Sequence, residues 1–349
     1  FSYLTGGALI GTFIALGLYS RYTLSTVMKT CYLVFLLVMV ILVSSSASYL
    51  WIVKSCFLIL GICCGCGLSG GAVIISKIYN DSKRASAFIA TDCSFSAAGY
   101  LFPTLAAWLL LQGVNWTWSY AAVGGLAVIL LFLLFIVRYP ETEASQANSK
   151  GIIQQLISIL QLRVILMGIG VCAYLIAQTT FLSWAPNYLQ ETFALSADSA
   201  SQVVGNYWGL SIFGLISSAI LIHKINARWM LMTAVILAVC MTLFFVFTTN
   251  SDHFLMLSFA LGFFTTCIYK IAMAIGSQQI PNAPAMLVTF LLFSGGIGSA
   301  TAPVLSGIAV NLYGVQGALK MSAWCFVLVL IMFSSCLLIE KQANKSALN

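Results

Sequence analysis

Residues 229–247 read WMLMTAVILAVCMTLFFVF, a run of 19 residues without a charged side chain. A helix of about 20 such residues, rising 1.5 Å per residue, crosses the hydrocarbon core of a bilayer, which is about 30 Å thick. A strand of a transmembrane barrel would instead alternate apolar and polar residues over about ten positions. The stretch therefore predicts a transmembrane α-helix.

The composition of the whole chain agrees with this prediction. Of its 349 residues, 61% are hydrophobic and 7% are charged, whereas a soluble domain carries about 25% charged residues. Lipid must therefore surround most of the protein, and backbone polar groups in lipid need partners within the chain, which leaves helices or closed barrels. Because the apolar runs are about 20 residues long, we predict an all-α polytopic membrane protein.

Eleven spans follow from the apolar runs. They cover residues 1–20, 28–47, 50–79, 85–112, 117–138, 164–188, 202–223, 228–248, 253–279, 285–312 and 317–339. A polar stretch, Glu141–Lys150, separates the fifth span from the sixth. After it, apolar residues recur at helical spacing from Gly151 to Arg163, which is typical of a short amphipathic helix on the membrane surface.

Basic residues are unequally distributed between the loops. When loops are assigned alternately to two sides, twelve of the fifteen lysines and arginines fall on one side, which the positive-inside rule makes cytoplasmic. The linker and the C-terminus are then cytoplasmic, and we expect a bacterial inner membrane. The net charge of +7 is spread over these loops, so nucleic acid is not an expected partner.

The sequence repeats itself at an offset of about 200 residues. Three pairs of segments align, namely 5–22 with 208–225, 58–61 with 261–262, and 99–103 with 298–303. Internal repeats of this kind build many transporters, in which the substrate lies near the midplane where the halves meet.

The alignment also predicts how the chain is divided. We expect a first bundle at residues 1–140, a linker with the surface helix at 141–163, and a second bundle at 164–349. The second bundle has six predicted helices and the first has five, because the helix at 164–188 has no counterpart. We therefore expect a further helix before Phe1 in the native protein. The alternative is a true eleven-helix protein.

Several motifs carry a family resemblance that covers nearly the whole chain. They are residues 90–103 (ATDCSFSAAGYLFP), 116–120 (WTWSY), 181–188 (FLSWAPNY), 206–208 (NYW) and 261–279, which begins LGFF and ends GSQQ. With its two bundles and cytoplasmic linker, the chain resembles the major facilitator superfamily, and within it the TsgA-like branch of the fucose:proton symporter family. The resemblance implies two six-helix bundles related by pseudo-two-fold symmetry, and a monomeric transporter rather than an enzyme.

Asp92 is the sharpest candidate for a functional residue. It lies eight residues after Arg84, hence about 12 Å along the helix from the cytoplasmic end. An ionised carboxylate at this depth costs about 3 kcal/mol. Burial favours the protonated carboxyl and a nearby cation favours the carboxylate, so we expect Asp92 to serve in proton coupling. The alternative is a structural role, with hydrogen bonds to hydroxyls such as those of Thr91 or Ser94.

Lys270 is the second candidate, at a depth similar to that of Asp92. It lies about ten residues before the cytoplasmic end of its helix, too deep for the side chain to reach the interface. Its ammonium should therefore face an anionic group of the substrate or pair with Asp92, and the alternative is a purely structural pair. Lys54 and Lys320 lie close to outer helix ends, where we expect them to snorkel.

Polar and aromatic residues of three further helices are expected to line a central cavity, by the resemblance. They are Gln178, Trp184, Asn187, Asn206, Tyr207, Trp208 and Tyr269. Aromatic rings beside amides suit a small polar solute. An interfacial aromatic belt is the alternative for Trp184.

The cysteines suggest packing rather than chemistry. Cys63 and Cys66 share a helix face, whereas Cys64 points about 100° away, and no His or carboxylate is near in the sequence. Small residues let helices approach closely, so we expect no metal site. The glycines form no phosphate cradle, because none follows a strand. No cofactor is expected.

These features predict a secondary active transporter that moves a small polar or anionic solute by alternating access, with proton symport. Two alternatives stay open. One is an exporter of toxic oxyanions or drugs, and the other is a membrane receptor or scaffold that does not transport.

Overall fold

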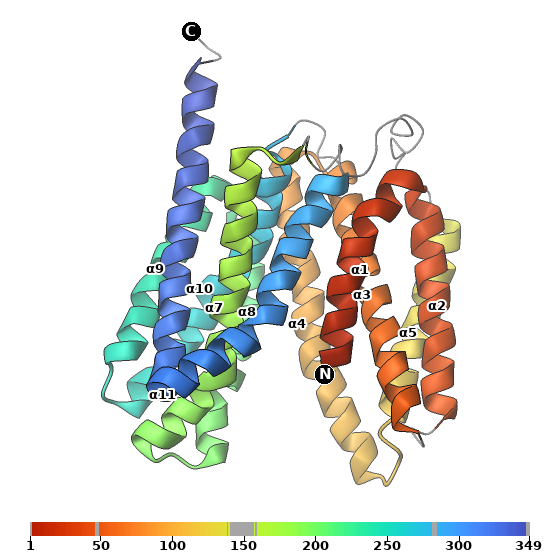
Figure 1. Cartoon of the computed structure of the whole chain (residues 1–349), viewed down its shortest axis with the longest axis horizontal. Coiled ribbons are helices and arrows are strands. Elements are labelled where there is room, and N and C mark those ends of the chain that lie inside the picture. The colour runs from red at the N-terminus through yellow and green to blue at the C-terminus, as the bar shows by residue number, and fades with distance from the viewer. Residues whose placement is uncertain are drawn as a thin grey trace. The chain divides into compact units, whose positions relative to one another are not determined.

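The computed structural model describes residues 2–45, 49–137, 139, 157, 159–280 and 285–346. The regular elements in these residues are helices (Figure 1). They are α1 (Ser2–Arg21), α2 (Leu24–Ser44), α3 (Leu50–Ile78), α4 (Asp81–Leu111), α5 (Trp118–Ile136), α7 (Leu162–Phe193), α8 (Ala197–Leu221), α9 (Ala227–Phe247), α10 (Ser251–Ser277) and α11 (Ala285–Ser346).

The last element, α11, contains two helical segments. Gly314 interrupts it with φ 69° and ψ −178°, a backbone conformation that glycine adopts without the steric cost of a Cβ. The interruption falls between the predicted spans 285–312 and 317–339, where Figure 1 shows a sharp bend near the label of α11. A positive φ at one glycine thus separates the two predicted helices without a loop.

Eight helices in the described part of the chain are long and apolar enough to cross a membrane. They are α2, α3, α5, α7, α8, α9, α10 and α11, the last counted once in spite of its bend. The apolar part of α1, Tyr3–Tyr19, is shorter. Most of the predicted linker and its surface helix, residues 140–156 and Ser158, lies outside the described residues.

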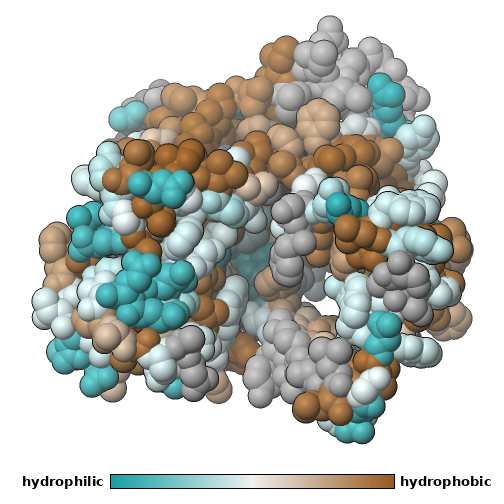
Figure 2. All heavy atoms as spheres, turned by 60° about the horizontal axis from the view of Figure 1, so that its bottom comes forward, coloured by the Kyte–Doolittle hydropathy of each residue, from teal (hydrophilic) through white to brown (hydrophobic). Residues whose placement is uncertain are grey.

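Large apolar side chains are exposed along these helices. Phe13, Val40, Phe132 and Phe247 each expose more than half of their surface. In the face drawn in Figure 2, hydrophilic residues (teal) form separate patches and apolar residues (brown) are exposed between them. Such a surface would be unfavourable in water and is suited to lipid.

The described helices pack as two compact units. Unit 1 comprises Phe1–Ile78, Ala97–Ile159 and Asn282–Phe293, and unit 2 comprises Tyr79–Ser96, Leu160–Pro281 and Ser294–Asn349. The first part of α4 therefore packs in unit 2, and the rest of α4 in unit 1. The boundaries at residues 140 and 164 follow the sequence repeat rather than packing, and they stay a prediction.

In unit 1, α1 and α3 approach each other at glycines. A Cβ on Gly61 would overlap the carbonyl oxygen of Leu4, and a Cβ on Gly11 would overlap the carbonyl oxygen of Ile62. The backbones of the two helices are therefore in direct contact. Contact this close is typical of helices that pack through small residues in a membrane.

In unit 2, α8 and α10 repeat both contacts. A Cβ on Gly262 would overlap the carbonyl oxygen of Tyr207, and a Cβ on Gly214 would overlap that of Phe263. Each residue lies about 200 positions after its equivalent in unit 1, at the offset expected of an internal repeat. The repeat predicted from sequence is therefore present in the packing of these two helix pairs.

The substitution Gly61→Ala tests this packing. The new methyl group must push α1 away from α3, and such overpacking costs about 1–3 kcal/mol, so the Tm of the purified protein should fall by several degrees. Gly71→Ala, on the same helix with open space around its Cα, is the matched control. It should leave Tm unchanged or raise it, because alanine favours a helix by up to about 1 kcal/mol. Equal Tm values for the two variants would contradict the close contact.

Candidate functional site

The candidate site is built around an ion pair inside unit 2. Nζ of Lys270 on α10 lies 2.9 Å from Oδ1 of Asp92 on α4. Of the lysine side chain 9% is exposed, and of the aspartate side chain 19%. Each charge offsets the cost of burying the other, and removing one partner would leave an uncompensated charge in a poorly solvated place.

The position of Asp92 distinguishes it from the other acidic residues. It lies in the interior of α4, whereas every other aspartate or glutamate lies in the linker or within about two turns of a helix end. Acidic groups at helix ends can reach water or lipid headgroups. Asp92 is therefore the one acid that the sequence offers to Lys270 at this depth.

An aromatic ring lies beside the lysine. Nζ of Lys270 is 5.2 Å from the ring centroid of Tyr269, the preceding residue on α10. The face of an aromatic ring attracts a cation, with a larger gain where water is excluded. Tyr269, predicted from sequence as a cavity residue, thus gives the ammonium a second, uncharged partner.

A polar network connects three helices of unit 2. Nε2 of Gln178 on α7 donates to the Tyr207 hydroxyl on α8 at 2.7 Å, and that hydroxyl lies 3.0 Å from Oγ1 of Thr265 on α10. The Thr265 hydroxyl donates to the Leu261 carbonyl, so the Tyr207 hydroxyl must be the donor to Thr265. The Tyr174 hydroxyl donates to the carbonyl of Thr265 at 2.9 Å.

This network joins two of the predicted residues to two that sequence reasoning missed. Gln178 and Tyr207 were predicted, whereas Tyr174 and Thr265 were not. Tyr207 is almost fully buried, and both of its described hydroxyl contacts lie within unit 2. Tyr207 therefore connects α7, α8 and α10. That it lines a cavity stays a prediction.

The remaining predicted cavity residues do not join the ion pair in the described structure. Asn206 donates from Nδ2 to the Leu255 carbonyl at 3.2 Å. Trp208 is 36% exposed, Trp184 is half-buried and Asn187 is exposed. Trp208 and Asn187 are thus accessible side chains, and their place in a central cavity stays a prediction.

Arg84 is a further residue that the sequence did not single out. It lies in the first turn of α4 and is buried, and its Nη1 donates to the Ser277 hydroxyl at the end of α10. Two residues later, Ser86 donates to the Ala219 carbonyl of α8. Together with Asp92, these residues give α4 polar contacts with both α8 and α10.

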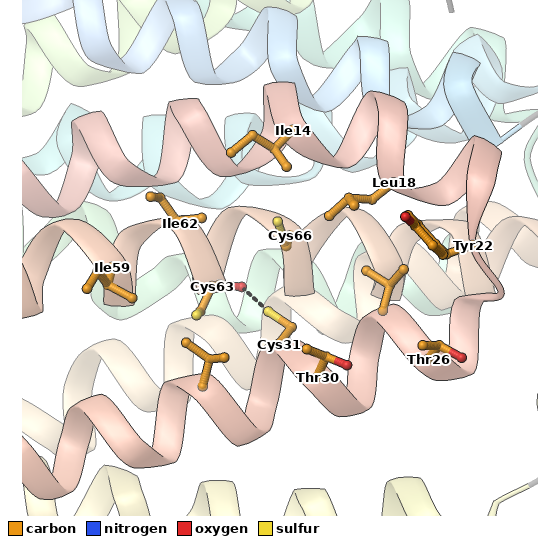
Figure 3. Close-up of a pocket in the computed structure, with 12 residues that line it drawn as sticks. Ile14, Leu18, Tyr22, Thr26, Thr30, Cys31, Ile59, Ile62, Cys63 and Cys66 are labelled. Atoms are coloured by element: carbon orange, nitrogen blue, oxygen red, sulfur yellow. Dashed lines mark hydrogen bonds between the residues drawn. The ribbon is translucent and has the colours of Figure 1, made fainter.

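Three of the eleven cysteines, Cys31, Cys63 and Cys66, line an apolar pocket in unit 1. The pocket has a volume of about 370 Å³ and lies between α1, α2 and α3 (Figure 3). The Cys31 thiol donates to the Cys63 carbonyl, which Figure 3 marks with a dashed line, and the Cys66 thiol donates to the Gly11 carbonyl. These bonds support the packing role expected for the cysteines. No metal-binding cluster of His, Cys, Asp or Glu was found in the described residues.

The chain matches a known protein family along nearly its whole length. The family model of the Major Facilitator Superfamily matches residues 1–253 and, in a second match, residues 166–348. Protein TsgA of Escherichia coli is 28% identical over 340 residues, which cover 95% of this chain and 83% of the relative. Protein TsgA of Shigella flexneri is 28% identical over 333 residues, with the same coverage.

Solved structures of that superfamily share the fold. The Escherichia coli fucose:proton symporter FucP superimposes with a TM-score of 0.83 at 13% identity, over 96% of this chain and 89% of its own. The human organic anion transporter MFSD10 gives a TM-score of 0.73 at 13% identity, over 95% and 83%. At these identities the likeness is one of fold.

A double-mutant cycle on the ion pair tests its energetic coupling. Lys270→Gln should lower Tm, because it leaves Asp92 without its cation, and Asp92→Asn should lower it for the converse reason. The double variant should be more stable than the sum of the two losses predicts, with a coupling of about 1–3 kcal/mol. The control is Lys320→Gln, since Lys320 is exposed near a helix end. Strictly additive losses would show that the two groups do not interact.

Proposed function

Because the chain belongs to the major facilitator superfamily, we propose that it is a secondary active transporter for a small polar or anionic solute, driven by symport with protons. The chain is a multi-pass membrane protein of a family of transporters rather than enzymes. Transport by alternating access needs no nucleotide site, since the energy comes from an ion gradient.

The observation that carries the proposal is the Asp92–Lys270 pair. A buried acid–base pair with partial exposure, at 19% for the aspartate, is costly to maintain in a membrane and is usually kept for a task. Asp92 is the group that would take up and release a proton. Lys270 would hold the anionic group of a substrate or restore the pair when the proton leaves.

The relatives support coupling to protons and an organic solute. FucP is a fucose:proton symporter and MFSD10 is an organic anion transporter, so the fold carries both kinds of solute. For this chain we propose that exposed side chains such as Trp208 and Asn187 contact the solute. Buried Tyr207 and Gln178 would shape the site through the network between the helices.

The membrane arrangement belongs to the same proposal. We propose eleven spans in residues 1–349. The expected location is a bacterial inner membrane, with the linker and C-terminus cytoplasmic and the protein monomeric. Single cysteines added to loops of a cysteine-free variant and labelled from either side of inverted vesicles would test the orientation.

Transport by proteoliposomes tests the function directly. Purified protein would be screened for uptake of labelled sugars, organic acids and oxyanions under an imposed inward proton gradient. For an accepted solute, Asp92→Asn should reduce gradient-driven uptake by at least about tenfold, a loss that corresponds to about 1.4 kcal/mol. Counterflow exchange of the same solute should persist, because exchange needs no net proton movement.

Two controls make this result specific. Asp252→Asn changes an exposed aspartate in the first turn of α10 and should leave uptake unchanged. Gradient-driven uptake at the normal rate by Asp92→Asn would remove proton coupling from this residue. Accumulation only under an outward gradient would instead indicate export.

A further inference from the structure

The buried ammonium of Lys270 is costly unless a negative charge lies close to it. In the described structure that charge is the carboxylate of Asp92, 2.9 Å away. Among the helices that the structure describes, no second acid lies more than about two turns from a helix end. When Asp92 is protonated, the buried ammonium therefore loses its counter-ion and must obtain another.

We infer that a small monoanionic substrate, bound through its carboxylate or an equivalent oxyanion, takes the place of the Asp92 carboxylate on Lys270. This inference rests on the proposed function and names its substrate class. The balance of charge is exact at each stage. The empty site holds Asp92⁻ and Lys270⁺, and the loaded site holds neutral Asp92, Lys270⁺ and the anion. One proton and one negative charge enter together, so transport through this site is electroneutral.

The position of Lys270 favours substrate binding over a return to solvent. Only 9% of its side chain is exposed, and the neighbouring α10 residues Ile271, Ala272 and Ile268 are buried. The ammonium is thus held at its depth, where it cannot snorkel. The Tyr269 ring at 5.2 Å stabilises the cation during the exchange of one anion for another without supplying a competing negative charge.

The neighbouring hydroxyls favour an anion over a neutral polyol. The protons of the Tyr174 and Tyr207 hydroxyls are already donated to Thr265, and the Thr265 hydroxyl donates to Leu261. A neutral sugar would find these three hydroxyl protons already engaged and could only donate its own. An ammonium has three donors, and it gives a carboxylate a charge-assisted contact that a sugar hydroxyl cannot match.

Protonation of Asp92 is the step that admits the anion. Lys270 on α10 contacts its carboxylate, and the groups close enough to interact with it electrostatically include Tyr269 on α10, Tyr174 on α7 and Cys93 on α4. Lys270 is the one basic group among them. Lower pH should therefore strengthen anion binding by the unmodified protein, whereas Asp92→Asn, which mimics the protonated acid, should bind anions at any pH near neutrality.

Thermal unfolding with simple anions tests this exchange without knowledge of the natural substrate. The probes are acetate, formate and nitrate, added to purified protein at pH 7.5, and acetamide is the neutral analogue of acetate. At a concentration about ten times the Kd, a bound anion should raise the Tm of Asp92→Asn by about 2 °C or more. The unmodified protein should respond less than half as strongly, and acetamide should have no effect on either.

The double variant Asp92→Asn/Lys270→Gln separates binding at Lys270 from general salt effects. It lacks both charges and should lose the anion-dependent rise. An equal rise in the double variant would overturn the inference, and so would the absence of any rise in Asp92→Asn with all three anions. Should Asp92→Asn unfold during purification, the unmodified protein at pH 5.5 takes its place, with Lys270→Gln as its control.

The Tm measurement tests anion binding and the uptake assay tests transport, so either one can fail while the other succeeds. A transporter of neutral solutes would pass the uptake experiment and show no anion-dependent rise in Tm. Conversely, a protein that binds anions at Lys270 but transports nothing would show the rise in Tm and no uptake. For an accepted monoanion, uptake should follow a pH gradient and stay unchanged when a membrane potential is imposed with potassium and valinomycin.

Discussion

Hydrocarbon cannot hydrogen-bond to a peptide group, so each segment of this chain that crosses it must satisfy its own backbone, and a helix does so. The same solvent gives helices no hydrophobic reason to associate, because lipid tails are as apolar as leucine. Close backbone contact then becomes the means of association. The contacts of Gly61 and Gly262 with the facing helices show this in both units. Because lipid does not drive helices together by the hydrophobic effect, the helices of this chain pack through close backbone contact. Because lipid solvates ions poorly, the charged residues of the site are paired.

Much of the fold could be predicted because lipid imposes a simple rule on composition. Runs of about 20 apolar residues predict helices with little ambiguity, and the internal repeat predicted that the two halves of the chain are built alike. Even the division of α11 at Gly314 falls between two predicted spans. No such rule applies to the linker, since a surface segment in contact with water and headgroups can satisfy its backbone hydrogen bonds in several ways.

The candidate site was predictable only where a residue type is rare in lipid. Asp92 and Lys270 were singled out because charge at depth is costly, and counting residues from the cytoplasmic end placed them at similar depth. Tyr174 and Thr265 were missed because hydroxyl residues are common in apolar helices, and their role depends on which helix faces them. Arg84 was missed because a cation at a helix start resembles a loop residue, although its side chain is buried and bonded to Ser277.

The glycine contact between α8 and α10 has a mechanical consequence. Two helices whose backbones touch at Gly214 and Gly262 cannot slide past each other without one carbonyl colliding with the next turn. The two helices should therefore tilt together rather than independently. Lys270 lies two turns beyond Gly262 on α10. The position of its ammonium should therefore change mainly when α8 and α10 move together, and less through rotation of its own side chain.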